Sequence, residues 1–353
     1  MLHLDGRVMF FTPRQQQLVE LNESAAALVE QAQSGITLHD MAMAFVPHAQ
    51  TRHDAQHMAA SWLADACESG LFNAAIAPAP AHCAGFSVDL GGHDFEVVAD
   101  DAALIDELRP PYGELIAPRG SGQRIHVIPF GDRIALLAEG GEAQFVAPGR
   151  LATRLRHTML TNILSRESRI ALHTACLVRG DRAVLLCGSP GTGKSTLTLA
   201  LIAQGWGFAG DDIAFADPSG MVQGLPLPLT LKRGSWPHAA AWADVEQLPV
   251  HEREDGAVLK YLPVRPVDAR PRRVGAVIRL QRQDGAQAAV DGWDRVAALQ
   301  TLFGEAYSES GQSSAGMVRG MCDLVAGAQC LTLSYGEAAD AAHLLAEDHA
   351  LAF

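Results

Sequence analysis

The chain has 353 residues, of which 48% are hydrophobic, and a formal net charge of −13. This length predicts two or three domains, each with enough apolar residues for its own core. The acidic balance argues against nucleic-acid binding, which depends on Lys and Arg neutralising phosphates. No apolar run is long enough to cross a bilayer, and Asp5 and Arg7 interrupt the stretch where a signal peptide is apolar. We therefore expect a soluble, cytoplasmic protein with no membrane partner.

Cysteine and lysine are both sparse and scattered. The six cysteines, which form no C-x-x-C pair, are Cys67, Cys83, Cys176, Cys187, Cys322 and Cys330. This spacing predicts buried, unbridged thiols in a reducing compartment, and neither a zinc site nor a disulfide framework. Of the 27 basic residues only Lys194, Lys232 and Lys260 are lysines. We expect lysine to persist where a compact, flexible charge is needed.

Residues 1–74 form the first predicted module. The strand patterns "LHLDGRVMFFTP" and "QQQLVELN" precede three helical patterns, and Thr37 and Thr51 are predicted to cap the second and third helices. Small strands with three helices predict a winged-helix-like domain. Acidic residues outnumber arginines in this module, so the basic footprint of a DNA-binding domain is missing.

The same module resembles the PqqD-like peptide-recognition domain. The resemblance rests on "LDGRVMFFTPRQQQLVELNESAAALVE", "GITLHDMAMAF" and "ASWLADACESGLF", which follow that family's order of strands, an "LN-x-(S/T)-A" helix start and a "GLF" end. It implies that the module binds the leader of a ribosomally made precursor peptide as an added strand. A docking or dimerisation domain is the alternative reading.

An Ala/Pro-rich linker, 75–82, and a β-rich lead-in subdomain, 83–165, are predicted to follow. The lead-in contains a strand pair around Gly91–Gly92 and a second hairpin in "RIHVIPFGDRIALLAE". It ends in "GRLATRLRHTMLTNILSRE", which has the pattern of a basic amphipathic helix.

The segment "GSPGTGKS" matches the Walker A pattern of nucleotide-binding proteins. A buried strand, "AVLLC", precedes it and a helix, "STLTLALIAQG", follows it, which is the context that this motif requires. Glycines let backbone N–H groups turn toward an anion, and the helix adds its positive end. The predicted cradle for ATP, or another nucleoside triphosphate, is Gly188, Ser189, Pro190, Gly191, Thr192, Gly193, Lys194, Ser195 and Thr196. Lys194 is expected to reach the phosphates and Ser195 to bind Mg²⁺.

Two adjacent carboxylates, Asp211 and Asp212, follow the short apolar stretch "WGFAG". One helix and one strand separate them from Lys194, so we expect them close to the glycine-rich loop. One carboxylate can hold Mg²⁺ while the other accepts a proton from an attacking hydroxyl. An Asp-Asp turn with no chemical role is the alternative. Since adjacent carboxylates repel, one of them is expected to have a raised pKa.

His173 precedes a hairpin around Gly180–Asp181 that leads into the glycine-rich loop. The order of histidine, hairpin, "GxxGxGKS" and "DD" resembles HPr kinase/phosphorylase over roughly residues 166–270. The resemblance implies an α/β, P-loop fold of the HPr-kinase/PEP-carboxykinase type for residues 166–353. It also implies Asp211 as general base, Asp212 as support for the metal and the histidine, and His173 as the family's histidine.

The chain departs from that family at two places. Thr196 stands where the family has an acidic residue after the "GKS" serine, and "YLPVRPVDARP" keeps Arg265 but lacks the family's "GRN". That segment bears on the reverse, phosphorylase reaction, so its loss implies a kinase that works in one direction. Lys232, Arg233, Lys260 and Arg265 are candidates for contacting phosphates or an acidic peptide, with solvated surface charge as the alternative.

The sequence therefore predicts an ATP- and Mg²⁺-dependent kinase that phosphorylates a Ser or Thr hydroxyl on a precursor peptide captured by the N-terminal module. A peptide carrier that only hydrolyses the nucleotide is the alternative. A transport-type ATPase is disfavoured because no "LSGGQ" element occurs. The family resemblance also implies a homo-oligomer, since HPr kinases form rings, although no interface is legible in the sequence.

Overall fold

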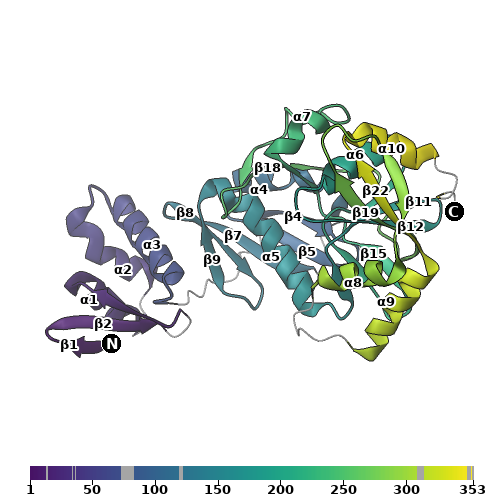
Figure 1. The fold of residues 1–353 in the computed structure, drawn as a ribbon. Helices are drawn as coiled ribbons and strands as arrows, with labels where there is room; N and C mark the ends of the chain where they lie inside the picture. The colour runs from purple at the N-terminus through teal and green to yellow at the C-terminus, as the bar shows by residue number, and fades with distance from the viewer. Residues whose placement is uncertain are drawn as a thin grey trace. The chain divides into compact units, whose positions relative to one another are not determined.

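The computed structural model describes residues 1–12, 15–33, 35, 37–72, 83–118, 122–307, 314–347 and 351 (Figure 1). The predicted linker, 75–82, lies outside these residues. Helices accompany mixed sheets, which confirms the predicted α/β class. The chain divides into two compact units: one comprises Met1–Phe86, Phe95–Leu108 and Ser121–Leu155, and the other Ser87–Asp94, Arg109–Gly120 and Arg156–Phe353. The predicted domain boundaries stay a prediction.

The first unit begins with a small antiparallel sheet in the order β1-β2-β3, followed by three α-helices. These elements are β1 (Leu2–Leu4), β2 (Arg7–Thr12), β3 (Gln17–Leu21), α1 (Glu23–Gln33), α2 (Leu38–Phe45), the 3-10 helix η1 (Val46–His48) and α3 (Arg52–Glu68). Thr37 accepts a hydrogen bond from the amide of Asp40, and Thr51 forms a reciprocal capping box with Asp54. Both predicted caps are confirmed.

The two faces of this small sheet differ in burial. Val8, Phe10 and Val19 pack with Leu21 and Val29 in the core beneath the sheet. Because successive strand residues point to opposite faces, the residues between them form an outer sheet face. It carries Leu2, Leu4, Phe11 and Leu18, which are 58%, 63%, 44% and 53% exposed.

The second sheet has the order β6-β4-β5-β7-β8-β9. Its segment contains β4 (Ala84–Asp89), β5 (Asp94–Ala99), α4 (Ala102–Leu108), η2 (Pro110–Leu115), β6 (Ile116–Ala117), β7 (Gln123–Phe130), β8 (Arg133–Ala138), β9 (Ala143–Val146), η3 (Pro148–Arg150) and α5 (Leu151–Arg166). Strands β7 and β8 pair antiparallel around Gly131 and Asp132, which confirms the predicted hairpin. The amphipathic helix expected after it is α5.

The rest of the second unit is built on a ten-stranded sheet with the path β13-β11-β12-β19-β15-β14-β10-β21, in which β22 also pairs with β19 and β20. A smaller sheet has the order β16-β18-β17. The elements are β10 (Ile170–Leu172), β11 (Ala175–Arg179), β12 (Arg182–Cys187), α6 (Lys194–Ala203), β13 (Gly207–Gly210), β14 (Ala214–Ala216), β15 (Met221–Gly224), β16 (Leu229–Lys232), η4 (Arg233–Ser235), α7 (Trp236–Ala239), β17 (His251–Glu252), β18 (Val258–Leu262), β19 (Arg272–Arg282), β20 (Ala289–Gly292), α8 (Arg295–Gly304), β21 (Ala306–Tyr307), α9 (Ala315–Gly327), β22 (Gln329–Tyr335) and α10 (Ala338–Glu347).

Helices cover both faces of the large sheet (Figure 1). On one face Leu186 of β12 joins a core with Leu197 of α6 and Leu345 of α10. On the other face its neighbour Leu185 packs with residues such as Leu302 of α8 and Leu324 of α9. Strand β12 pairs in parallel with β19, and β19 with β22. When helices cover both faces of a sheet, the residues of a central strand are apolar on both sides. This explains why the sequence of β12, "AVLLC", does not alternate between apolar and polar residues.

The cysteines are not joined in disulfides. Cys176, Cys187 and Cys330 are buried, as predicted, whereas Cys322 is exposed and Cys67 and Cys83 are half-buried. Burial raises the pKa of Cys176 to about 12, so this thiol packs as a small apolar side chain rather than as a nucleophile.

Candidate functional site

The glycine-rich loop, Gly188–Ser195, joins the end of β12 to the start of α6. Gly191 and Gly193 have φ values of 91° and 93°, in the left-handed region that favours glycine. A Cβ on Gly188 would lie 2.8 Å from Thr192 Oγ1, and one on Gly193 would lie 2.8 Å from Tyr335 Oη. Gly188 and Gly193 therefore have no room for a side chain, whereas Gly191 lies in open space and is favoured by its positive φ alone.

Two hydrogen bonds hold the loop in this shape. Tyr335 Oη at the end of β22 donates to the carbonyl of Thr192 at 2.8 Å, and Thr192 Oγ1 donates to Ser189 O at 2.9 Å. The helix that follows begins after Gly193, which offers no side-chain cap. The amides of the first turn of α6 are thus left for another acceptor, which is the arrangement that binds anions at helix N-termini.

Lys194 is the first residue of α6 and is nearly buried. Its Nζ donates a hydrogen bond to the carbonyl of Gly188, at the opposite end of the loop. The ammonium thus lies across the loop, beside the amides of the first turn. A cation and a ring of backbone donors at one place form a site for a polyanion.

Asp211 lies directly after β13 and contacts the start of α6. Ser195 Oγ donates to Asp211 Oδ2 at 2.8 Å, and the amide of Thr230 lies 3.4 Å from the same oxygen. Oδ1 of Asp211 is buried without a hydrogen-bond partner among the described residues. Burial, with the neighbouring Asp212 carboxylate, raises the pKa of Asp211. The expected pairing of a high-pKa carboxyl with the glycine-rich loop is therefore present in the fold.

Asp212 has a different environment from Asp211. Its side chain is 35% exposed and forms an ion pair with Arg156 of α5, which is itself buried. The Arg156 guanidinium also lies over the ring of Tyr261, 5.7 Å from its centroid. Adjacent residues in the sequence thus present one buried carboxyl and one accessible carboxylate, oriented by an arginine.

His173 follows β10, and its backbone amide donates to the carbonyl of Glu305 at 3.1 Å. Burial lowers the pKa of His173, and the charges of Lys194 and Lys232 lower it further while Asp212 opposes them. The charges of the loop lysine and the second aspartate therefore both act on the imidazole of His173. The structure brings His173, Lys194, Ser195, Asp211 and Asp212 together.

Three residues of this region were not predicted: Arg156, Tyr335 and Glu305. Glu305 follows α8, and its Oε2 is buried without a hydrogen-bond partner in the described part of the chain. Burial raises the pKa of Glu305, while the charge of Lys194 lowers it. The sequence has Thr196, which is buried in α6, where the resembled family has an acidic residue. Glu305 supplies a carboxyl near the loop that Thr196 does not.

The four basic candidates separate into different environments. Lys232 and Arg233 are exposed at the end of β16, the strand that also carries Thr230. Lys260 is buried instead: its Nζ donates to Val245 O at 2.7 Å and lies 4.7 Å from the centroid of Trp236. This geometry gives Lys260 a structural role within the small sheet, so we do not place it in the site.

Arg265, the fourth candidate, is 62% exposed and lies 3.6 Å from Glu114 Oε1. Its partner is thus a carboxylate of the same unit. The ion pair is accessible to solvent and is weak by the usual standard of exposed pairs.

No protein-family model matches the chain, and no curated protein matches it in sequence. The fold defines it as an α/β protein with mixed sheets. Within the described residues, no helix is both long and apolar enough to cross a bilayer.

Proposed function

We propose that this protein is an ATP- and Mg²⁺-dependent kinase that phosphorylates a Ser or Thr hydroxyl of a ribosomally made precursor peptide in the cytoplasm. The observation that carries the proposal is the 2.8 Å hydrogen bond between Ser195 and Asp211 beside the glycine-rich loop. It joins a hydroxyl of the kind that holds Mg²⁺ to a carboxyl of the kind that accepts a proton.

The loop fits a triphosphate and its metal. A Cβ on Gly188 or Gly193 would clash with a neighbouring side chain, so these glycines let the loop keep its turned backbone. The uncapped start of α6 offers backbone N–H donors. Lys194 supplies the positive charge, and Asp211 Oδ1 is a buried oxygen that still needs a partner. A bound nucleotide with Mg²⁺ supplies the phosphoryl group and the charge that stabilises its transfer.

The residues of the chain then divide the work. The loop amides and Lys194 bind and orient the phosphates, and Ser195 with the accessible Asp212 holds Mg²⁺. Asp211 accepts the proton of the acceptor hydroxyl. Its raised pKa lies closer to neutral pH, and a general base is most effective when its pKa is near the working pH. Asp211 is buried and Asp212 is accessible, and this difference favours an acid–base role for Asp211 and a metal-binding role for Asp212.

The outer sheet face supports the peptide part of the proposal. Leu2 and Leu4 lie on the edge strand β1, and Leu18 lies on the other edge strand, β3, opposite Phe11. A peptide added as a further strand gains backbone hydrogen bonds at the edge and apolar contacts on the exposed face. A homo-oligomer is compatible with this arrangement but is not required by it.

The test is transfer of label from γ-labelled ATP to a short peptide encoded beside the gene. We expect label on the peptide with the wild-type protein, and a loss of at least about a hundredfold in Asp211→Asn. Asp211→Asn should still bind the nucleotide. Asp284→Asn, at a carboxylate that is 99% exposed, is the matched control and should transfer normally.

Two results would contradict the proposal. Label that reaches only water, in the presence of bound peptide, would indicate a carrier that hydrolyses the nucleotide. Full transfer by Asp211→Asn would remove Asp211 as the base.

A further inference from the structure

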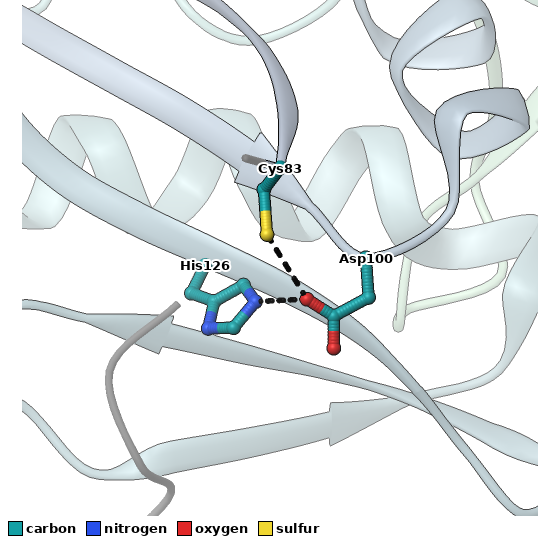
Figure 2. A group of neighbouring side chains, drawn as sticks. All are labelled: Cys83, Asp100 and His126. Atoms are coloured by element: carbon teal, nitrogen blue, oxygen red, sulfur yellow. Dashed lines mark hydrogen bonds and ion pairs between the residues drawn. The ribbon is translucent and has the colours of Figure 1, made fainter. Parts of the chain in front are cut away.

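Three side chains that can bind a metal ion meet in the first unit, and Figure 2 shows them pointing toward one another. Cys83 directly precedes β4, Asp100 directly follows β5, and His126 lies within β7. Oδ1 of Asp100 lies 2.8 Å from His126 Nε2 and 3.4 Å from Cys83 Sγ. One ligand atom from each residue lies within 4.8 Å of both others.

The strand register explains why these residues meet. Val98 of β5 is opposite His126 of β7, so the two side chains are on the same face of the sheet. Asp100 follows two residues after Val98 and returns to that face. Strands β4 and β5 are neighbours in the sheet, and a turn closed by the bond from Leu90 N to His93 O joins them. The start of β4, next to Cys83, therefore lies beside the end of β5, next to Asp100.

Thiolate, imidazole and carboxylate are the ligands that zinc prefers, and three protein ligands with one open position form a common zinc arrangement. Around a tetrahedral zinc, the sulfur–oxygen and nitrogen–oxygen separations are about 3.6 Å and about 3.4 Å, given the usual bond lengths. The 3.4 Å between Cys83 and Asp100 is close to this value. The 2.8 Å between His126 and Asp100 needs a widening of about half an ångström, which rotation of the Asp100 side chain can supply.

We propose that Cys83, Asp100 and His126 bind one zinc-class divalent ion, with a fourth position open to water. The Cys83 thiol releases its proton to solvent and the resulting thiolate sulfur donates an electron pair to the ion, so no oxidant or reductant is needed. The ion joins the start of β4, the end of β5 and the middle of β7, three strands of one sheet. This site is independent of the proposed kinase function, since none of its ligands belongs to the glycine-rich loop or its carboxylates.

Burial and charge suit an ion that enters from solvent. The side chain of His126 is 6% exposed and fixed in the sheet, whereas that of Asp100 is 42% exposed and leaves an entry path. Arg124, two residues before His126, is paired with Glu96 at 2.9 Å, so its charge is balanced by a carboxylate. The negative charge of Asp100 is therefore available to the ion.

The order of contacts disfavours a nucleophilic cysteine at this place. In a cysteine–histidine pair the imidazole contacts the thiol and takes its proton, and a carboxyl orients the imidazole from the other side. Here Asp100 is the residue that contacts both others (Figure 2). This arrangement favours three ligands around a shared centre over a proton relay.

The test uses the full-length protein, freed of metal by a chelator, and Co²⁺ as a spectroscopic probe. We expect about one Co²⁺ per chain, with a thiolate-to-cobalt absorption band in the near ultraviolet that equimolar Zn²⁺ removes. Cys83→Ser should abolish the band and weaken binding by at least about tenfold, and Asp100→Asn should weaken binding similarly. Cys322→Ser, at an exposed cysteine, is the control and should behave as wild type.

A thermal scan distinguishes loss of the site from loss of the fold. Zn²⁺ should raise the Tm of the wild type and of Cys322→Ser, because the ion binds the folded chain. The same Zn²⁺ concentration should raise the Tm of Cys83→Ser and Asp100→Asn less, and Mg²⁺ should not replace Zn²⁺. A cobalt spectrum without a thiolate band, or one that Cys83→Ser leaves intact, would overturn the proposal.

Discussion

Ser195 donates a 2.8 Å hydrogen bond to Asp211, although a helix and a strand separate the two residues in the sequence. The contact forms because α6 starts at the end of β12, while β13 ends beside it and delivers Asp211 to the same edge of the sheet. A carboxyl buried there is costly when ionised. Ionisation of Asp211 should therefore lower the stability of the folded protein.

The first prediction concerns pH. The folded protein holds the pKa of Asp211 above the value of an unfolded aspartate, so the stability it contributes is complete in acid and is lost as pH rises through the raised pKa. Asp211→Asn removes this loss. Chemical denaturation should show the variant more stable than wild type at pH 8, with the difference shrinking toward pH 4; a constant difference across that range would argue against the raised pKa.

A second prediction follows from the packing of Gly193 against Tyr335. Gly193→Ala sets a Cβ 2.8 Å from the tyrosine hydroxyl, at a φ of +93°, and should cost about 1–3 kcal/mol of stability and most of the nucleotide affinity. Tyr335→Phe removes the clash but also the bond to Thr192, at about 1 kcal/mol. The double variant should therefore lose less stability than the two single losses added together, and strict additivity would contradict the close contact.

Third, Arg156 should be coupled to Asp212. Arg156→Met keeps the buried volume but removes the partner of a half-exposed carboxylate, so we expect a loss of about 1–2 kcal/mol in the free energy of unfolding, below the value for a fully buried pair. Asp212→Asn in the same chain should recover part of that loss. Arg253→Met, which breaks an exposed pair with Asp255, should change stability less.

The two lysines outside the loop should behave in opposite ways. Lys260→Met leaves the carbonyl of Val245 without its donor and should destabilise the fold by about 1–3 kcal/mol, with little effect on phosphate transfer per folded molecule. Lys232→Met should leave stability unchanged and raise the KM for the peptide, since the exposed ammonium lies within electrostatic range of His173. Thermal scans and steady-state kinetics on both variants separate the two effects.

The last prediction tests the outer sheet face. Leu4→Asp should weaken peptide binding about tenfold, which is about 1.4 kcal/mol, because a charge replaces an apolar contact on the edge strand. Val250→Asp is the control, since Val250 is 57% exposed against 63% for Leu4 but lies in the second unit. Fluorescence titration with the labelled peptide gives both affinities, and equal losses would indicate a non-specific charge effect.

Local patterns in the sequence predict local features of the structure well. Thr37 and Thr51 cap their helices as expected, because a cap depends only on residues three positions apart. The contact of Asp211 with the glycine-rich loop was also expected, since strand, loop and helix fix where the next strand ends. In these cases the spacing of residues along the sequence was enough to predict the contact.

Contacts between distant segments were not predictable in the same way. Tyr335 reaches Thr192 from a strand 143 residues later, and nothing near Tyr335 marks it as a loop residue. Arg156 left a weak signal, since it falls among the apolar positions of α5, between Leu155 and Met159, where a solvated arginine is unusual. Cys83 precedes β4, Asp100 follows β5 and His126 lies within β7. Their separations of 17 and 26 residues follow no metal-binding spacing.

The bond from Tyr335 to Thr192 also sets an order of events during synthesis. While the chain is still emerging from the ribosome, the glycine-rich loop exists without the strand that stabilises it, because Tyr335 of β22 follows Thr192 by 143 residues. The loop therefore gains the hydrogen bond that holds its shape only after β22 has been made and has joined the sheet.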